Sequence, residues 1–181
     1  GIVTPYSCAA WIAAIHQGVD VATAAGLSHV AGATGKTSET AVRALYGLEE
    51  QALLEMGDFA GALLKYICRH PVARLTIAGG FAKISKLGQG HMDLHSGRSE
   101  VDITALAAHL SALGASPEIV DQAITAPSAG AVLALAGEFP LGQRVAAEAL
   151  SVIEERLSDA VIIVDVTIFD RLGKLIAHAG P

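Results

Sequence analysis

The sequence predicts an α/β fold with a mixed, mainly parallel sheet flanked by helices and a C-terminal antiparallel strand hairpin. Short apolar runs that end in glycine alternate with helical patterns over residues 1–115, which is typical of parallel β-α units. Near the end of the chain, two apolar runs, 161–168 and 174–178, flank an Asp-Arg-Leu-Gly turn. So short a turn joins antiparallel neighbours, so the sheet is expected to have an antiparallel edge.

The first quarter of the chain reads as a helix, a strand and a second helix. Residues 8–25 form a helical pattern, with Ser7 as a plausible N-cap and Gly26 as the stop. A short strand over 27–31 leads into a glycine turn. The helical pattern resumes over 37–46.

The next segment repeats this alternation. Residues 51–56 favour a second strand, and Asp58 is well placed to cap a helix over 59–69. Pro71 ends that helix. The apolar run 72–78, closed by two glycines, is the clearest strand of the sequence.

Helical patterns dominate the rest of the chain. A short helix over 81–87 precedes a loop without hydrophobic period, and an amphipathic helix over 99–113 follows. Residues 117–157 read as helical, with breaks near Pro127 and Pro140. We expect a single domain over residues 1–181. Its parts are an α/β core (1–115), a helical segment (116–158) and a β-hairpin (159–181).

Composition narrows the function classes. Hydrophobic residues make up 52% of the chain and charged residues 17%, which excludes intrinsic disorder. The net charge of −6, from 12 Lys plus Arg and 18 Asp plus Glu, argues against nonspecific binding to nucleic acid. No apolar run is long enough to predict a membrane span, and we expect no secretory signal. Cys8 and Cys68 are too far apart in sequence for a disulfide framework or a zinc motif, so a cytoplasmic protein is expected.

The first chemical candidate is the glycine turn of HVAGATGKT, with Gly32, Thr34 and Gly35. Its Gly-Lys-Thr ending resembles a phosphate-binding loop, but Val30 stands where such a loop needs glycine. The run 161–165 ends in an aspartate, as the Mg²⁺-holding strand of such enzymes does. An ordinary tight turn is an equally good interpretation. Either way, free N–H groups at a helix start suit a nucleotide or a carboxylate.

The second candidate is Gly57-Asp58, at the end of the second strand. Ligands of open α/β sheets lie at the carboxyl ends of strands, where an acid often accepts hydrogen bonds from a ribose. A helix N-cap is the alternative role for Asp58, and the two roles are compatible.

The third candidate is the polar cluster that follows Gly79-Gly80. Its side chains are Lys83, Lys86, His91, Asp93, His95, Ser96 and Arg98. The cations suit the carboxylates of a ligand, and a histidine can donate a hydrogen bond or accept a proton near neutral pH. A metal site of His91, Asp93 and His95 is a weaker alternative, because the spacing is not that of a common zinc motif. A capped surface loop is a third.

At this segment the sequence becomes recognisable. GGFAKISKLGQGHMDLHSGRSEVD resembles the Gly–Lys–x–x–Lys–Leu loop and the His-Ser loop of the CbiD family, the cobalt-precorrin-5B methyltransferases of cobalamin biosynthesis. Further similar segments are 1–7, 32–35, 56–61 and 166–173, so the resemblance runs along the whole chain. Thr4, Tyr6 and Cys8 depart from the family's usual residues. Members of the family are longer, and this sequence lacks the equivalent of their N-terminal half.

The resemblance implies methylation of carbon 1 of cobalt-precorrin-5B by S-adenosylmethionine, giving cobalt-precorrin-6A. The cobalt belongs to the tetrapyrrole substrate, and no protein-bound metal is expected. The implied donor-binding residues are Gly32, Thr34, Gly35, Gly57, Asp58, Gly79 and Gly80. The implied substrate-binding residues are Lys83, Lys86, Asp93 and Arg98. The implied catalytic residues are His95, Ser96 and His91, with His95 preferred beside the reacting carbon.

Two other functions stay open at this point. One is a noncatalytic fragment that binds S-adenosylmethionine or the tetrapyrrole. The other is a nucleotide-binding protein with a loop like that of the phosphate-loop NTPases. The expected partners are the tetrapyrrole and the family's N-terminal half, with no nucleic acid and no membrane. The sequence leaves a homo-oligomer open.

Overall fold

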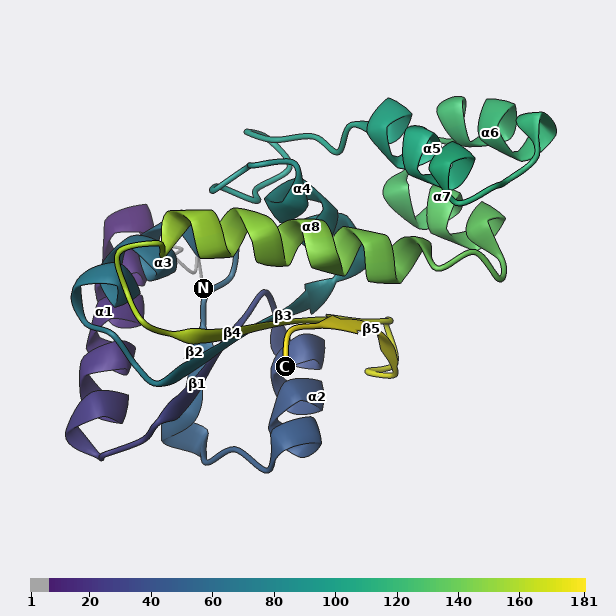
Figure 1. Cartoon of the computed structure of the whole chain (residues 1–181). Coiled ribbons are helices and arrows are strands. Elements are labelled where there is room, and N and C mark those ends of the chain that lie inside the picture. The colour runs from purple at the N-terminus through teal and green to yellow at the C-terminus, as the bar shows by residue number, and fades with distance from the viewer. Residues whose placement is uncertain (1–6) are drawn as a thin grey trace, which may run out of the picture.

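The structure is a computed structural model that describes residues 7–181. Five strands form one sheet in the order β2-β1-β3-β4-β5 (Figure 1). The strands are β1 (His29–Ala33), β2 (Leu53–Glu55), β3 (Arg74–Gly80), β4 (Ile163–Phe169) and β5 (Leu175–Ala179). The first four are parallel, and β5 runs antiparallel to β4. The predicted fold class is therefore confirmed, including its terminal hairpin.

The helices cover the two faces of the sheet unequally (Figure 1). They are α1 (Cys8–Ala24), α2 (Lys36–Tyr46), α3 (Ala60–Arg69), α4 (Phe81–Gly88), α5 (Ile103–Ala112), α6 (Pro117–Ile124), α7 (Ala129–Ala136) and α8 (Leu141–Arg156), with a 3₁₀ turn at Glu50–Ala52. On one face, α1, α3, α4 and α8 form the large core with the sheet, while α2 covers the other face. The helices α5, α6 and α7 gather beside α4, beyond one end of the sheet. Among the described helices, none combines the length and apolar character that a bilayer span requires.

The central strand β3 shows why both faces need cover. Leu75 and Ile77 point into the large core, whereas Ala78 joins the smaller cluster under α2 with Val42 and Phe169. A strand of a parallel sheet is apolar on both faces, because helices pack on each of them. The continuous apolar run that predicted this strand follows from that position.

Strands β1 and β3 lie two residues further along the chain than predicted, and this places Gly32, Gly79 and Gly80 within strands. Strands β1 and β3 end at Ala33 and Gly80, two residues beyond the predicted ends of 31 and 78. Gly32 and Gly79 are thus strand residues and not turn residues. The chain needs glycine at Gly32 because a Cβ there would collide with Leu63 of α3.

The starts of α3 and α5 also differ from prediction. The helix α5 begins at Ile103 and not at 99, because the Asp102 side chain accepts a hydrogen bond from Ala105 N at 3.0 Å and caps it. The N-cap of α3 is Phe59, without a side-chain cap, so the N-cap role expected for Asp58 was wrong. The predicted cap at Ser7 and the breaks near Pro127 and Pro140 are confirmed.

A Gly32→Ala substitution tests this packing. The added methyl group meets the buried Leu63 and lies 3.2 Å from Ile77, so it is expected to lower the free energy of unfolding by about 1–3 kcal/mol. Urea denaturation measures the change. Gly130→Ala is the matched control, because the nearest atom to its added Cβ is 3.8 Å away and a helix favours alanine over glycine. Equal urea midpoints for Gly32→Ala and the wild type would contradict the packing argument.

Candidate functional site at the carboxyl edge of the sheet

The topology places a switch point between β1 and β3. From β1 the chain continues to β2, whereas from β3 it continues to β4 on the opposite side of the sheet. Ligands of open α/β sheets bind in the crevice outside the carboxyl ends of two such strands. A pocket of about 550 Å³ opens there. Its lining segments are residues 34–38, 80–83, 128–130, 133, 169–171 and 176.

The β1–α2 turn supplies one wall of this pocket. Gly35 is the N-cap of α2 and has no side chain to satisfy the first helical amides, which have no intrahelical acceptor either. The Ser38 hydroxyl donates to Gly35 O at 2.8 Å, so it does not cap them. Thr34 lines the pocket at 6% exposure, and its hydroxyl makes no hydrogen bond with residues 7–181. Free N–H groups and a buried hydroxyl make this wall suitable for a carboxylate or phosphate.

Lys83 connects this turn with the end of β2. Its Nζ donates to Thr34 O at 2.8 Å and lies 3.0 Å from Asp58 Oδ1. The contact with Asp58 is an ion pair without hydrogen-bond geometry, since Oδ1 is buried and has no hydrogen-bond partner within the described part of the chain. The buried Oδ1 of Asp58 thus faces the Lys83 ammonium, and Lys83 links the two turns.

The backbone around Asp58 is tightly held. Gly57 has a φ of +58°, which glycine adopts without strain, and its N–H donates to Ala33 O at 3.1 Å. The Trp11 indole donates to Glu55 O at 3.0 Å. These bonds attach the end of the short strand β2 to β1 and α1, so the position of Asp58 is set by three elements.

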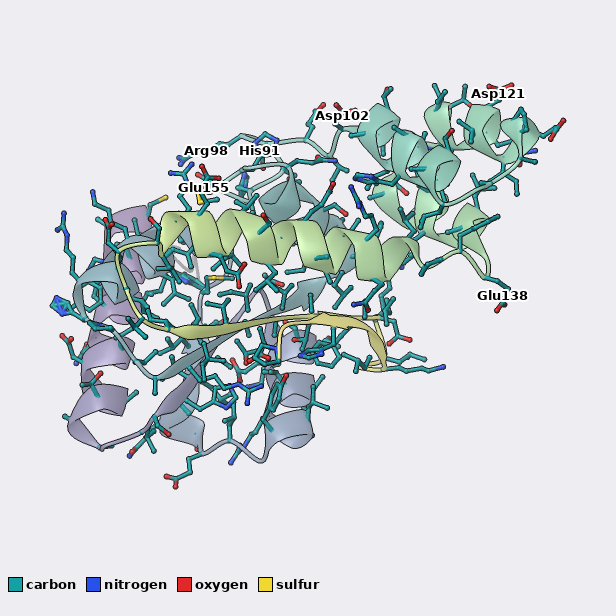
Figure 2. The ribbon with its side chains drawn as sticks, viewed as in Figure 1. His91, Arg98, Asp102, Asp121, Glu138 and Glu155 are labelled. Carbon is teal, nitrogen blue, oxygen red and sulfur yellow. The ribbon has the colours of Figure 1, made fainter. Side chains whose placement is uncertain are left out.

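The loop from α4 to α5 carries His91, Arg98 and Asp102 (Figure 2). It is attached to the same edge of the sheet, because Leu94 N donates to Asp58 O at 2.8 Å. The loop that sequence reasoning singled out thus lies beside Asp58, outside the lining of the pocket.

Within this loop, Asp93 is the central acceptor. It accepts from His95 N at 3.1 Å and from Arg98 Nη1 at 2.8 Å. Burial raises the pKa of Asp93, but the His95 amide and Arg98 outweigh it, so the pKa lies below its usual value. The His95 side chain is exposed, and its Nδ1 accepts from Gly97 N at 3.0 Å, which assigns the proton to Nε2 of the neutral ring. Arg98 is therefore already paired, and His95 presents an N–H donor to solvent.

The structure separates the residues that sequence reasoning grouped. Thr34, Gly35, Gly80 and Lys83 line the pocket. The others lie elsewhere: Gly57 and Asp58 at the end of β2, Gly32 and Gly79 inside strands, and His91, Asp93, His95, Ser96 and Arg98 on the adjoining loop. Lys86 is 8% exposed, and its Nζ donates to Leu94 O at 2.9 Å. This hydrogen bond attaches the loop that follows α4 to that helix.

The sequence pattern did not indicate most of the lining from α7, β4, β5 and the turn between those strands, including Leu133, Arg171 and Ile176. Arg171 stands in the Asp-Arg-Leu-Gly turn, which was predicted as a hairpin connection and as part of the family resemblance, but not as a site segment. Its position directly after β4 could have indicated a site residue. The carboxyl end of β4 lies at the same edge of the sheet as the carboxyl ends of β1 and β3.

Two alternative interpretations lose support. In residues 7–181, no three His, Cys, Asp or Glu side chains are placed to hold a metal ion, so His91, Asp93 and His95 do not form a metal site. Asp165, the expected Mg²⁺ ligand of an NTPase, lies in mid-strand opposite Thr76 and is bound by Arg74 at 2.6 Å. It does not line the pocket.

Comparison with known proteins finds similar sequences along the chain. Residues 93–180 match the family model described as CbiD, C-terminal domain. The chain is 53% identical over 179 residues to the cobalt-precorrin-5B C(1)-methyltransferase of Paramagnetospirillum magneticum, covering 99% of this chain and 50% of that protein. The proteins of the same name from Bradyrhizobium sp. and Methylorubrum extorquens are 54% and 55% identical, each over 98% of this chain and 48% and 50% of their own lengths. No solved structure matches.

The chain thus spans about half the length of the curated relatives it matches. The family-model match begins in the loop after α4 and includes β4 and β5, which share one sheet with β1, β2 and β3. The division into one domain over residues 1–181 stays a prediction. The match to the CbiD C-terminal domain, with the identity along nearly the whole sequence, leads to one conclusion: the chain belongs to the CbiD family.

Proposed function

We propose that this chain is the part of a cobalt-precorrin-5B C(1)-methyltransferase that binds S-adenosylmethionine and holds it against carbon 1 of the tetrapyrrole. The product would be cobalt-precorrin-6A. The observation that carries this proposal is the 53% identity over 99% of the chain to an enzyme of that name. The switch-point pocket supports it with a location where a donor fits.

The donor's charged and polar groups match the groups that the pocket leaves unused. The first amides of α2 and the Thr34 hydroxyl suit its carboxylate. The Asp58 side chain lies beside the pocket and is 26% exposed, so its carboxylate is the proposed acceptor for a ribose hydroxyl. A Cβ at Gly80 would meet open space, so the backbone there is accessible to a ligand.

When bound, S-adenosylmethionine supplies an electrophilic methyl group, which the ring carbon takes with its own electron pair while the S–CH₃ bond breaks and its pair stays on sulfur. The residues of this chain then have to bind and align, because an in-line displacement depends mainly on the approach of the two reacting atoms. Lys83 performs the alignment by joining the turns at Thr34 and Asp58. His95, Ser96 and His91 are the proposed polar groups beside the acceptor.

The remaining half of the relatives' length is the proposed partner that completes the tetrapyrrole site. A noncatalytic binding fragment is the second candidate, favoured by the 50% coverage of the relatives. A fragment that binds the donor without catalysis differs from the enzyme only in turnover once that half is restored. We place the reaction in the cytoplasm, since Cys8 and Cys68 are both unpaired.

Calorimetric titration with S-adenosylhomocysteine tests the proposal, with ATP plus Mg²⁺ as the comparison. We expect S-adenosylhomocysteine alone to bind. Thr34→Val should weaken binding of S-adenosylhomocysteine by about fivefold, which corresponds to one neutral hydrogen bond of about 1 kcal/mol. Thr104→Val, at an exposed position of α5, is the control. Binding of ATP alone, or of neither ligand, would contradict the proposal.

A further inference from the structure

We propose that Arg171, on the turn between β4 and β5, binds a peripheral carboxylate of the tetrapyrrole, whose ring lies against α7 and β5. The inference rests on the proposed function, because it places the acceptor of that reaction within the same pocket. It also moves the carboxylate-binding role from Arg98, where the sequence suggested it, to a different element of the fold.

The charge of Arg171 is available to a ligand. The residue lines the pocket and is exposed, and it forms no ion pair within residues 7–181. Its neighbour Asp170 is occupied, since its Oδ1 accepts from Leu172 N at 2.8 Å and from Lys174 N at 2.9 Å. The turn thus directs its own carboxylate at its backbone and leaves the guanidinium without a counter-charge.

The other cations of the pocket lining, and Arg98 on the adjoining loop, already have carboxylate partners. Arg98 is bound to Asp93 at 2.8 Å, Lys83 lies 3.0 Å from Asp58, and Lys36 pairs with Glu39. A substrate with several acetate and propionate groups needs an unpaired cation, because a charge-assisted hydrogen bond to a guanidinium is among the stronger contacts available to a carboxylate. Within the lining of the pocket, Arg171 meets that need.

The wall beside Arg171 is apolar. Leu133 of α7, Phe169 of β4 and Ile176 of β5 line it, and Ile176 is 37% exposed although it is aliphatic. Apolar surface with one charged group at its border is the usual composition of a small-molecule site. It fits a flat macrocycle with charged substituents around its rim better than it fits a nucleotide, whose phosphates need several cations.

The donor wall and this wall face the same space. Thr34, Gly35, Leu133 and Arg171 all line the same pocket of about 550 Å³. Methyl transfer needs donor and acceptor in contact, so an acceptor bound at Arg171 lies next to a donor bound at the start of α2.

Binding of a cobalt corrin to the full chain, followed by its absorbance, tests the inference. The probes are cobyrinic acid, whose acetate and propionate groups are free, and its fully methylated ester, which has the same ring without the charges. We expect the acid to bind at least tenfold more tightly than the ester. Arg171→Ala should weaken binding of the acid by about tenfold, the value of a charge-assisted contact. Binding of the ester should not change. Arg156→Ala, at an exposed position of α8, is the matched charge control and should change neither.

A second pair of variants tests the apolar wall. Leu133→Trp fills the pocket and should abolish binding of both probes, whereas Ala134→Trp, next to it on the exposed side of α7, should not. Titration with S-adenosylhomocysteine separates the two proposals. If the nucleoside binds but Arg171→Ala leaves the acid's affinity unchanged, the carboxylate site is wrong and the proposed function stands. If the acid binds through Arg171 but the nucleoside does not bind, the donor site is wrong. If neither corrin binds, this inference fails.

Discussion

Replacing Asp165 with alanine is expected to lower the free energy of unfolding by about 3 kcal/mol. The Asp165 side chain is fully buried and accepts from Arg74 Nε at 2.6 Å and from Arg74 Nη2 at 2.8 Å. His178 Nε2 lies 3.2 Å from it. Removal of one partner of a buried pair costs about 3–5 kcal/mol, and the lower end applies because Arg74 is 31% exposed and water can solvate part of its charge.

Urea denaturation measures this change, and two further variants establish its cause. Asp121→Ala, at an exposed position of α6 (Figure 2), should stay within about 0.5 kcal/mol of the wild type. The double variant Arg74→Met with Asp165→Leu should recover most of the loss, because a buried ion pair and a well-packed apolar pair are often equivalent. If the double variant is no more stable than Asp165→Ala, the loss of stability comes from packing and not from the unpaired charge of Arg74.

The same pair makes stability depend on pH. Burial raises the pKa of Asp165, but hydrogen bonds from Arg74 and His178 outweigh it, so its pKa in the folded chain lies below the ordinary 3.8. A carboxyl group with a lowered pKa stabilises the fold fully above its unfolded pKa and loses that contribution as the pH falls through the folded value. The stability difference between wild type and Asp165→Asn should therefore be constant at neutral pH and shrink below pH 3.8. A difference that stays constant in acid would contradict this assignment.

Replacing Lys83 with methionine is expected to weaken S-adenosylhomocysteine binding by roughly thirtyfold, the equivalent of about 2 kcal/mol. The ammonium donates to Thr34 O and balances the charge of Asp58, so its loss releases both turns that form the proposed donor site. Calorimetric titration gives the affinity. Lys65→Met, at an exposed position of α3, is the control for charge.

Lys86→Met should lower the stability of the fold and leave the affinity for S-adenosylhomocysteine almost unchanged. Its ammonium is buried and donates to Leu94 O, so the variant leaves a buried carbonyl unsatisfied and should lower the free energy of unfolding by about 1–3 kcal/mol. Binding per folded molecule should change little. If both lysine variants lost affinity equally at equal stability, the distinction between a pocket residue and a buried structural residue would be wrong.

Local sequence patterns determined most of the architecture. These patterns are local, because each one affects only the few residues around it. Examples are the apolar run of β3, the caps and stops of α1, and the prolines that separate α6, α7 and α8. The class of fold and the order of its elements are therefore visible in the sequence, as is the resemblance in the loop after α4. The ends of β1 and β3 were not visible, because pairing with neighbouring strands extends a strand through glycines that read locally as a turn.

Tertiary structure alone decided which polar residues meet. Lys83 and Lys86 stand three residues apart in the sequence, yet one lines the pocket and the other is buried. Arg171 reaches the same pocket as Thr34 only because β3 lies between β1 and β4 and all three strands run parallel. The local sequence shows which chemical groups are present. The order of the strands decides which of these groups have partners within the protein and which stay available to a ligand. The sequence by itself therefore determined the fold class, the family and the candidate chemistry, while the packing of the sheet decided which cations remain for a ligand.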